Sequence, residues 1–293
     1  MYVFVAATLW ALIGISVQII YSNSDVTSGW LITVRMLIAG VILTAFCALK
    51  SGKDILRILK SRRDTLSFVL FSAMNFLMQF SYLEAIKYSN AAIATLIQYL
   101  SPSMVLFSMA VINGKMPSKT DFICVFAALA GLILLSLHGD FSSLSISLSA
   151  LIWGLISAAS LAFTSIYPVK LVSKYGSAPI QGWSMILCGA VSAFAFQPFR
   201  TSYVIKPFVW IIIILSAVLG CAVAFTMYLS GVKLIGSTHA SVLSNIEPVI
   251  SSVISILFLN FVCTGYDIAG MILIIGSAVT LALTGTKQAE AQK

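Results

Sequence analysis

The sequence is divided into apolar runs of about twenty residues, separated by short stretches that carry most of the charge. A run of this length is what an α-helix needs to cross the hydrocarbon core of a bilayer. Turn and charge signals place ten such segments, at 3–21, 30–49, 65–83, 90–112, 120–138, 147–169, 178–198, 207–230, 238–260 and 267–285. The predicted fold class is therefore an all-α integral membrane protein with ten transmembrane helices.

The scarcity of charge excludes a soluble domain. Only 9% of the 293 residues are Asp, Glu, Lys or Arg and 60% are hydrophobic, whereas soluble domains carry about 25% charged residues. The net charge of +8 does not indicate a nucleic-acid partner, because the basic residues lie in short loops and form no basic face. The expected surroundings are a lipid bilayer.

The loop charges predict the orientation, since cytoplasmic loops carry an excess of Lys and Arg. Thirteen of the seventeen basic residues fall in one set of loops and the C-terminal tail; the other set holds Lys87, Arg200 and Lys206. Both termini are therefore expected in the cytoplasm, with the chain in the inner or plasma membrane. The most basic stretch, Lys50–Asp64, is interpreted as an anchor at the inner surface and is a candidate for a short amphipathic helix.

The two halves of the chain resemble each other. At an offset of 146 residues the second half matches the first at Tyr82 and Tyr228, Pro102 and Pro248, and Asp121 and Asp267, and an offset of 143 pairs Trp10 with Trp153. Five spans per half is an odd number, so the second half is expected to enter the membrane from the opposite side. The prediction is two inverted five-helix repeats, 1–140 and 141–293, with a binding site near the midplane between them and alternating access as the mechanism.

Several motifs resemble the EamA-type branch of the drug/metabolite transporter superfamily. The resemblance rests on the segment 82–87, on Ser101-Pro102 and on Glu247-Pro248-Val249, and it extends over essentially the whole chain. It implies a transporter, more often of export than of uptake. One departure is that Gly114-Lys115 stands where the family often has Gly-Glu, so no role of that glutamate is carried over.

Glu247 is the leading candidate for a binding or coupling residue. A charged side chain at the bilayer centre costs roughly 2.5–3.5 kcal/mol on insertion scales, so it usually faces a cavity or a partner. Pro248 follows it, and Pro102 occupies the matching place after Gln98 and Tyr99. Two helices interrupted at equivalent positions are a typical sign of a transport site. The alternative is a buried, purely structural carboxyl group.

Amide and aromatic side chains complete the predicted site. Asn75 and Gln79 share a helix face with Tyr82, and they serve either to bind a polar solute or to hold helices together. Trp10 and Trp153 lie inside their spans, so they are candidates for aromatic walls that suit rings and organic cations; ordinary packing is the alternative. The remaining candidates are Tyr99, Asn245 and Tyr228.

Two further features concern gating and assembly. Arg35 and Glu84 are expected on the outer side, either as an ion pair that closes a gate or as Arg35 extending to the interface. Gly131, Gly270 and Gly276 have the spacing of small-residue helix contacts and indicate a candidate homodimer face.

The predicted function is a secondary transporter of small metabolites, most consistent with amino acids or related organic amines. No basic residue is expected at the midplane, which disfavours phosphate-bearing substrates. Proton coupling is left open, and no cofactor or metal is expected, because the five cysteines lack ligand spacing. An intramembrane enzyme is disfavoured by the absence of a catalytic cluster. The alternative is a non-transporting scaffold or lipid-handling accessory protein.

Overall fold

The computed structural model describes residues 1–51, 58, 60–114, 116, 118–137, 147–200, 203–258 and 264–290, and every regular element in these ranges is a helix. The elements are α1 (Tyr2–Asn23), α2 (Ser28–Ser51), α3 (Arg62–Tyr88), α4 (Ala91–Gln98), α5 (Ser101–Asn113), α6 (Lys119–Leu137), α7 (Leu148–Ile166), α8 (Val169–Tyr175), α9 (Ser177–Phe196), the 3₁₀ turn η3 (Pro198–Arg200), α10 (Pro207–Leu215), the π-helical segment η4 (Ser216–Ala224), α11 (Phe225–Ile235), α12 (Ser237–Ser244), α13 (Glu247–Phe258) and α14 (Gly265–Glu290).

Within the described ranges, seven helical segments are long and apolar enough to cross a bilayer. They are Tyr2–Asn23, Ser28–Leu49, Arg62–Tyr88, Ile93–Asn113, Leu148–Ile166, Ser177–Phe196 and Pro207–Ile235. The other three expected segments overlap α6, α12 with α13, and α14. Large apolar side chains on the outside, such as Leu49 (90% exposed) and Phe194 (85% exposed), suit contact with acyl chains. The all-helical membrane class is confirmed, and the total of ten spans stays a prediction.

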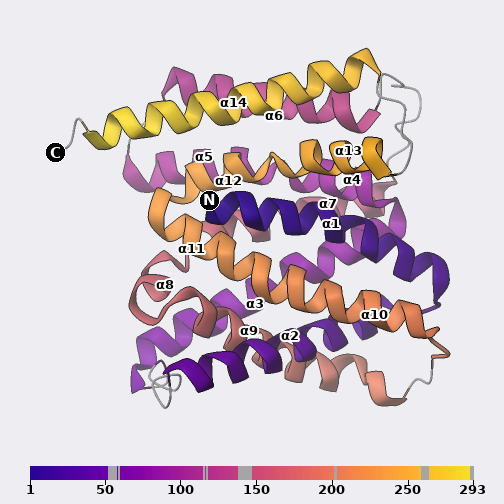
Figure 1. Cartoon of the computed structure of the whole chain (residues 1–293). Coiled ribbons are helices and arrows are strands. Elements are labelled where there is room, and N and C mark those ends of the chain that lie inside the picture. Colours follow the sequence, from indigo (N-terminus) through magenta and orange to yellow (C-terminus); the bar gives the residue numbers. More distant parts are fainter. Residues whose placement is uncertain are drawn as a thin grey trace.

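The long helices run back and forth between the left-hand and right-hand sides of the view in Figure 1. The N-terminus, the end of α14 and the short helix α8 all lie on the left-hand side in that view. Consequently α1 runs away from this side, whereas α7, which leads into α8, runs toward it. The predicted helix around Lys50–Asp64 falls mostly outside the described residues.

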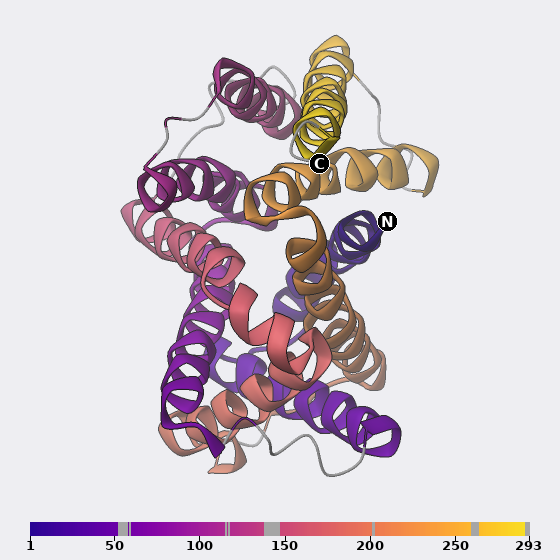
Figure 2. The ribbon, with the colours of Figure 1, turned by 90° about the vertical axis from the view of Figure 1, so that its left-hand side faces the viewer.

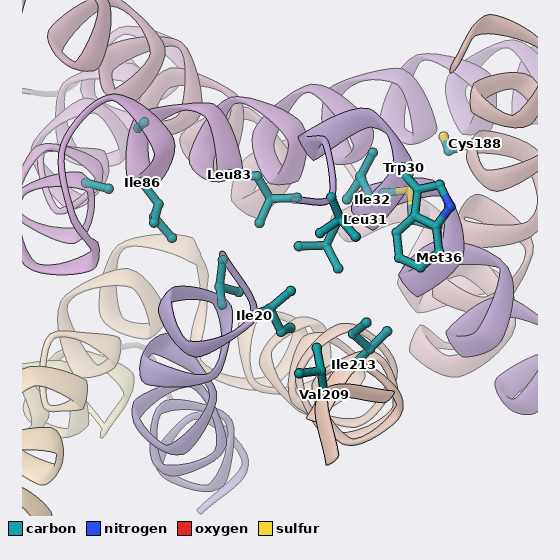
Figure 3. Packing of buried hydrophobic residues seen from close by; sticks show 14 residues of the cluster. Ile20, Trp30, Leu31, Ile32, Met36, Leu83, Ile86, Cys188, Val209 and Ile213 are labelled. Carbon is teal, nitrogen blue, oxygen red and sulfur yellow. The ribbon is translucent and has the colours of Figure 1, made fainter. Parts of the chain in front are cut away.

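A cluster of buried apolar residues joins the first three helices to α10 (Figure 3). Ile20 of α1, Leu31 of α2 and Leu83 of α3 are fully buried together with Ile213 of α10. Close packing of this kind is what holds helices together in lipid, where burial from water has already occurred.

Helices α6 and α14 pack on each other and stand beside the rest of the bundle (Figure 2). Their backbones approach closely, because a Cβ atom on Gly131 would lie 2.6 Å from the carbonyl oxygen of Gly270. These two glycines therefore form a contact within the chain, while the space beside Gly276 is open. The homodimer expected from this pattern stays a prediction.

Two of the predicted spans, 90–112 and 238–260, are each interrupted. The chain makes a turn at 99–100 between α4 and α5, and again at 245–246 between α12 and α13. Pro102 and Pro248 follow these turns and lack the N–H that would continue the helical hydrogen bonds. Both eight-residue helices before the turns, 91–98 and 237–244, are related by the offset of 146 residues.

The matching Asp121 and Asp267 have equivalent structural roles. Asp121 accepts a hydrogen bond from the N–H of Ser118 at 3.0 Å, and Asp267 accepts one from the N–H of Thr264 at 2.7 Å. The Ser and Thr hydroxyls accept in return from the N–H groups of the aspartates. Each pair is a capping box at the start of α6 or α14.

One ion pair ties α8 to α3 on the side of the termini. Lys174 donates to Asp64, and the hydroxyl of Tyr175 donates to the same carboxylate at 2.6 Å. The hydrogen bond to Asp64 raises the pKa of the Lys174 ammonium. The contact links the first half of the chain to the second.

Candidate functional site

A cavity of about 100 Å³ lies at the centre of the bundle, bordered by α1, α2, α3, α7 and η4 and by both interrupted helices. This volume is several times what a single water molecule requires. The cavity brings together residues far apart in the sequence, from Trp10 to Glu247.

The two helix interruptions supply the polar wall. Glu247 is the first residue of α13, and Gln98 is the last residue of α4; both border the cavity, as do Tyr99, Ser101 and Pro102. The amide of Gln98 donates to the hydroxyl of Ser157 at 2.6 Å. A turn in each helix is what allows these side chains to reach the centre.

The Tyr99 hydroxyl lies next to the carboxyl group of Glu247. It makes no hydrogen bond of standard geometry to any described residue, and neither does the buried hydroxyl of Ser101. Buried polar atoms are nearly always hydrogen-bonded, so these hydroxyls have the capacity to bind water or a solute in the cavity.

Another part of the wall is aromatic. The ring of Trp10 lies 5.0 Å from that of Phe225 and 5.3 Å from that of Tyr228. The indole N–H of Trp10 donates to the carbonyl of Gly220 at 3.4 Å, within the π-helical segment η4. Tyr228 shares a 2.7 Å hydrogen bond with Ser165, which fixes its ring. Such a wall favours an apolar or cationic group.

Helix α3 contributes Gln79 and Tyr82. The amide of Gln79 donates to the side-chain oxygen of Asn75 at 3.2 Å, and Asn75 donates to Gln181 and Ser184 of α9. The Tyr82 hydroxyl is 2.7 Å from that of Thr95. Gln79 is therefore held in place by a buried network that begins at α9.

Five predicted residues lie outside the cavity wall: Asn75, Trp153, Asn245, Pro248 and Glu84. Asn75 is fully buried in the network behind Gln79. Trp153 packs edge-on against Phe80, with 5.7 Å between the ring centroids. Asn245 is buried in the turn before α13.

The expected latch between Arg35 and Glu84 is not formed; among the residues described, no ion pair joins them. Arg35 instead points inward and borders the cavity with only 7% of its surface exposed. The expectation that no basic residue lies near the midplane was therefore wrong. The guanidinium group approaches η4, where its Nη2 is 3.8 Å from the position that a Cβ on Gly220 would occupy.

The wall also contains residues that sequence reasoning did not select, among them Ser101, Cys221, Phe225, Ser241 and Ser244. The repeat contained a signal for Ser101, since it stands 146 residues before Glu247. Ser241, Ser244 and Phe225 carry no such signal, because serine and phenylalanine are common throughout apolar helices.

The arrangement combines one carboxyl group, one guanidinium group, hydroxyl and amide groups and an aromatic wall. Small-molecule sites are typically of this kind, with a few polar groups placed on an apolar lining. The cavity is therefore suited to bind a small polar organic solute.

Comparisons with known proteins agree with this description. The EamA-like transporter family matches residues 1–137 and again 148–283. The chain is 36% identical over 290 residues, covering 99% of it and 96% of the relative, to the uncharacterized inner membrane transporter YicL of Salmonella typhimurium strain LT2. It is 22% identical to the uncharacterized transporter YxxF of Bacillus subtilis strain 168, covering 91% and 85% of the two chains. A solved crystal structure shares the fold, with a TM-score of 0.79, 18% identity and 97% of both chains covered.

Proposed function

Since the chain belongs to the EamA-like transporter family of the drug/metabolite transporter superfamily, we propose that it is a secondary transporter that exports or exchanges amino acids or related organic amines. Its multi-pass placement in the inner membrane agrees with the apolar helices and with the inner membrane relative. The observation that carries the proposal is the central cavity, whose wall contains Glu247 together with the aromatic rings of Trp10 and Tyr228.

The proposed architecture is two inverted five-helix repeats, 1–140 and 141–293. Three observations support it: the family matches each half separately, the interrupted helices and capping boxes recur at an offset of 146 residues, and α1 and α7 run in opposite directions (Figure 1). The packing is also reciprocal, because α3 contacts α7 while α1 contacts α11 and η4. Two such halves can exchange conformations and expose the cavity to each side in turn.

Glu247 has the role of binding an ammonium group or a coupling proton. A carboxyl group in a water-poor cavity cannot stay charged without a partner at low cost. An ammonium group of the substrate supplies that partner, and a proton supplies it when the substrate leaves. This alternation would couple substrate movement to proton movement or to exchange.

The test is transport by the purified protein in liposomes against a panel of amino acids and amines. We expect flux by the wild-type protein and a loss of tenfold or more in Glu247→Gln, because the neutral amide cannot balance an ammonium group. Glu84→Gln is the matched control, since Glu84 lies outside the cavity wall, and its flux should stay within twofold of wild type.

Two results would contradict the proposal. One is the absence of flux for every member of the panel, which would favour a scaffold or an accessory protein. The other is normal flux in Glu247→Gln, which would remove the carboxyl group from the mechanism.

A further inference from the structure

Arg35 is a charged residue of the cavity wall to which the proposed function assigns no role. It lies on α2 and is nearly buried, and its Nη2 is 3.8 Å from the position that a Cβ on Gly220 would occupy. Its Nε has no hydrogen-bond partner among the described residues. Burying a charged donor without a hydrogen-bond partner costs free energy. A substrate group that accepts a hydrogen bond from Arg35 would offset this cost.

The two charges of the cavity do not neutralise each other directly. No ion pair within the described ranges joins Arg35 to Glu247. Arg35, Tyr82 and Glu247 all border the same cavity. The cavity thus presents a positive and a negative group in one wall.

We propose that Arg35 is the receptor for a carboxylate of the substrate, and that Glu247 receives the ammonium group of the same molecule. This inference rests on the proposed function and narrows its substrate class to zwitterionic amino acids, leaving out amines that lack a carboxylate. A guanidinium group offers two parallel N–H donors that match the two oxygens of a carboxylate. The substrate side chain then faces the aromatic wall of Trp10, Phe225 and Tyr228.

A phosphate group would also suit an arginine, but the remainder of the cavity disfavours it. Glu247 repels a doubly charged anion, whereas it attracts the ammonium group of a zwitterion. A single arginine balances a single carboxylate, and the substrate then enters with no net charge. This neutrality matters because an unbalanced charge inside the bilayer is expensive.

The experiment compares matched ligands that differ by one charged group. Phenylalanine, phenethylamine (no carboxylate) and 3-phenylpropanoate (no ammonium) form the matched set, and phosphoethanolamine is added as a phosphate-bearing amine without the ring. All four are tested for binding by thermal shift and for flux in liposomes, together with the corresponding leucine set. Wild-type protein should bind each amino acid at least tenfold more tightly than its amine, its deaminated acid or phosphoethanolamine.

The variant Arg35→Gln should lower the affinity for the amino acid to that for the amine and change the amine affinity less than threefold. Arg35→Lys keeps the charge but loses the paired donors, so its preference for the amino acid should be intermediate. Arg200→Gln is the matched control, because Arg200 is exposed and remote from the cavity; its preference should equal that of wild type.

Three results would overturn the inference: equal binding of amine and amino acid by wild type, equal losses for both ligands in Arg35→Gln, or tightest binding of phosphoethanolamine. If Arg35→Gln does not fold, the wild-type ligand series and Arg35→Lys still decide. The absence of flux for all amines and all amino acids would instead reject the proposed function itself, so the two failures are distinguishable.

Discussion

The two tryptophans that match in the repeat have different surroundings in the structure. Trp10 borders the cavity and donates to the Gly220 carbonyl, whereas Trp153 packs on Phe80 outside the cavity wall. The cavity is thus asymmetric even though the sequence pairs the two residues. We therefore expect Trp10, and not Trp153, to contribute to substrate affinity in this conformation.

Substitution of each tryptophan by phenylalanine tests this difference. Trp10→Phe removes a hydrogen bond and part of the aromatic wall, a loss of roughly 1 kcal/mol, and should weaken substrate binding by about fivefold. Trp153→Phe should lower the melting temperature through poorer packing and change the affinity by less than twofold. Binding isotherms and thermal unfolding of both variants give the comparison, and equal effects on affinity would contradict the assignment.

Part of the site was predictable from single residues. Glu247, Gln79 and Gln98 stand out because polar groups are costly in apolar helices, and all three border the cavity. The direction of a side chain is less accessible to prediction. Arg35 lies where a side chain can extend either outward to the interface or inward, and the inward direction brings it against η4, a segment distant in the sequence. Asn75, like Gln79, is an amide residue in an apolar helix, but its side chain is directed toward α9.

At the level of elements, both interrupted helices share a proline two residues after the turn. Pro102 and Pro248 had indicated helix breaks near these positions in the sequence. The sequence did not indicate the π-helical segment η4 or the separate short helix α8. A π-helix arises from a change in hydrogen-bond register, and no residue type marks it reliably.

The turn before α13 gives a prediction for an element. Pro248→Ala supplies the missing N–H and allows the helix to continue from α12, which would rotate Glu247 away from the cavity. We expect flux to fall about tenfold while the melting temperature changes little, since proline is well tolerated in the first turn of a helix and its replacement there gains little stability. The matched control is Pro207→Ala, at the start of α10 and away from any interruption. Unchanged flux in Pro248→Ala would show that the turn does not depend on the proline.

For the molecule as a whole, the loop charges predict the direction in which the chain is inserted in the membrane. Labelling of single cysteines can check this prediction. The structure places α8 on the side of both termini and η3 on the other side (Figure 1). With cytoplasmic termini, a membrane-impermeant maleimide should label Arg200→Cys in intact cells but should label Lys170→Cys only after lysis. Four native cysteines are buried, and Cys263 is replaced by alanine in the background.

The opposite labelling pattern would show that both termini lie outside the cytoplasm. Labelling of both sites in intact cells would indicate mixed insertion, which would contradict the positive-inside assignment.

The π-helical segment η4 changes how the helix faces before and after it are oriented relative to each other. One residue in an α-helix corresponds to about 100° of rotation, and a π turn absorbs an extra residue without breaking the rod. The faces of α10 and α11 are therefore offset relative to those of an uninterrupted helix such as α3. Because of this offset, α10 directs Ile213 into the apolar core while α11 directs Tyr228 toward the cavity. Deletion of one residue from η4 would restore the α-helical relation between the two faces. Either Ile213 would then leave the apolar core or Tyr228 would turn away from the cavity.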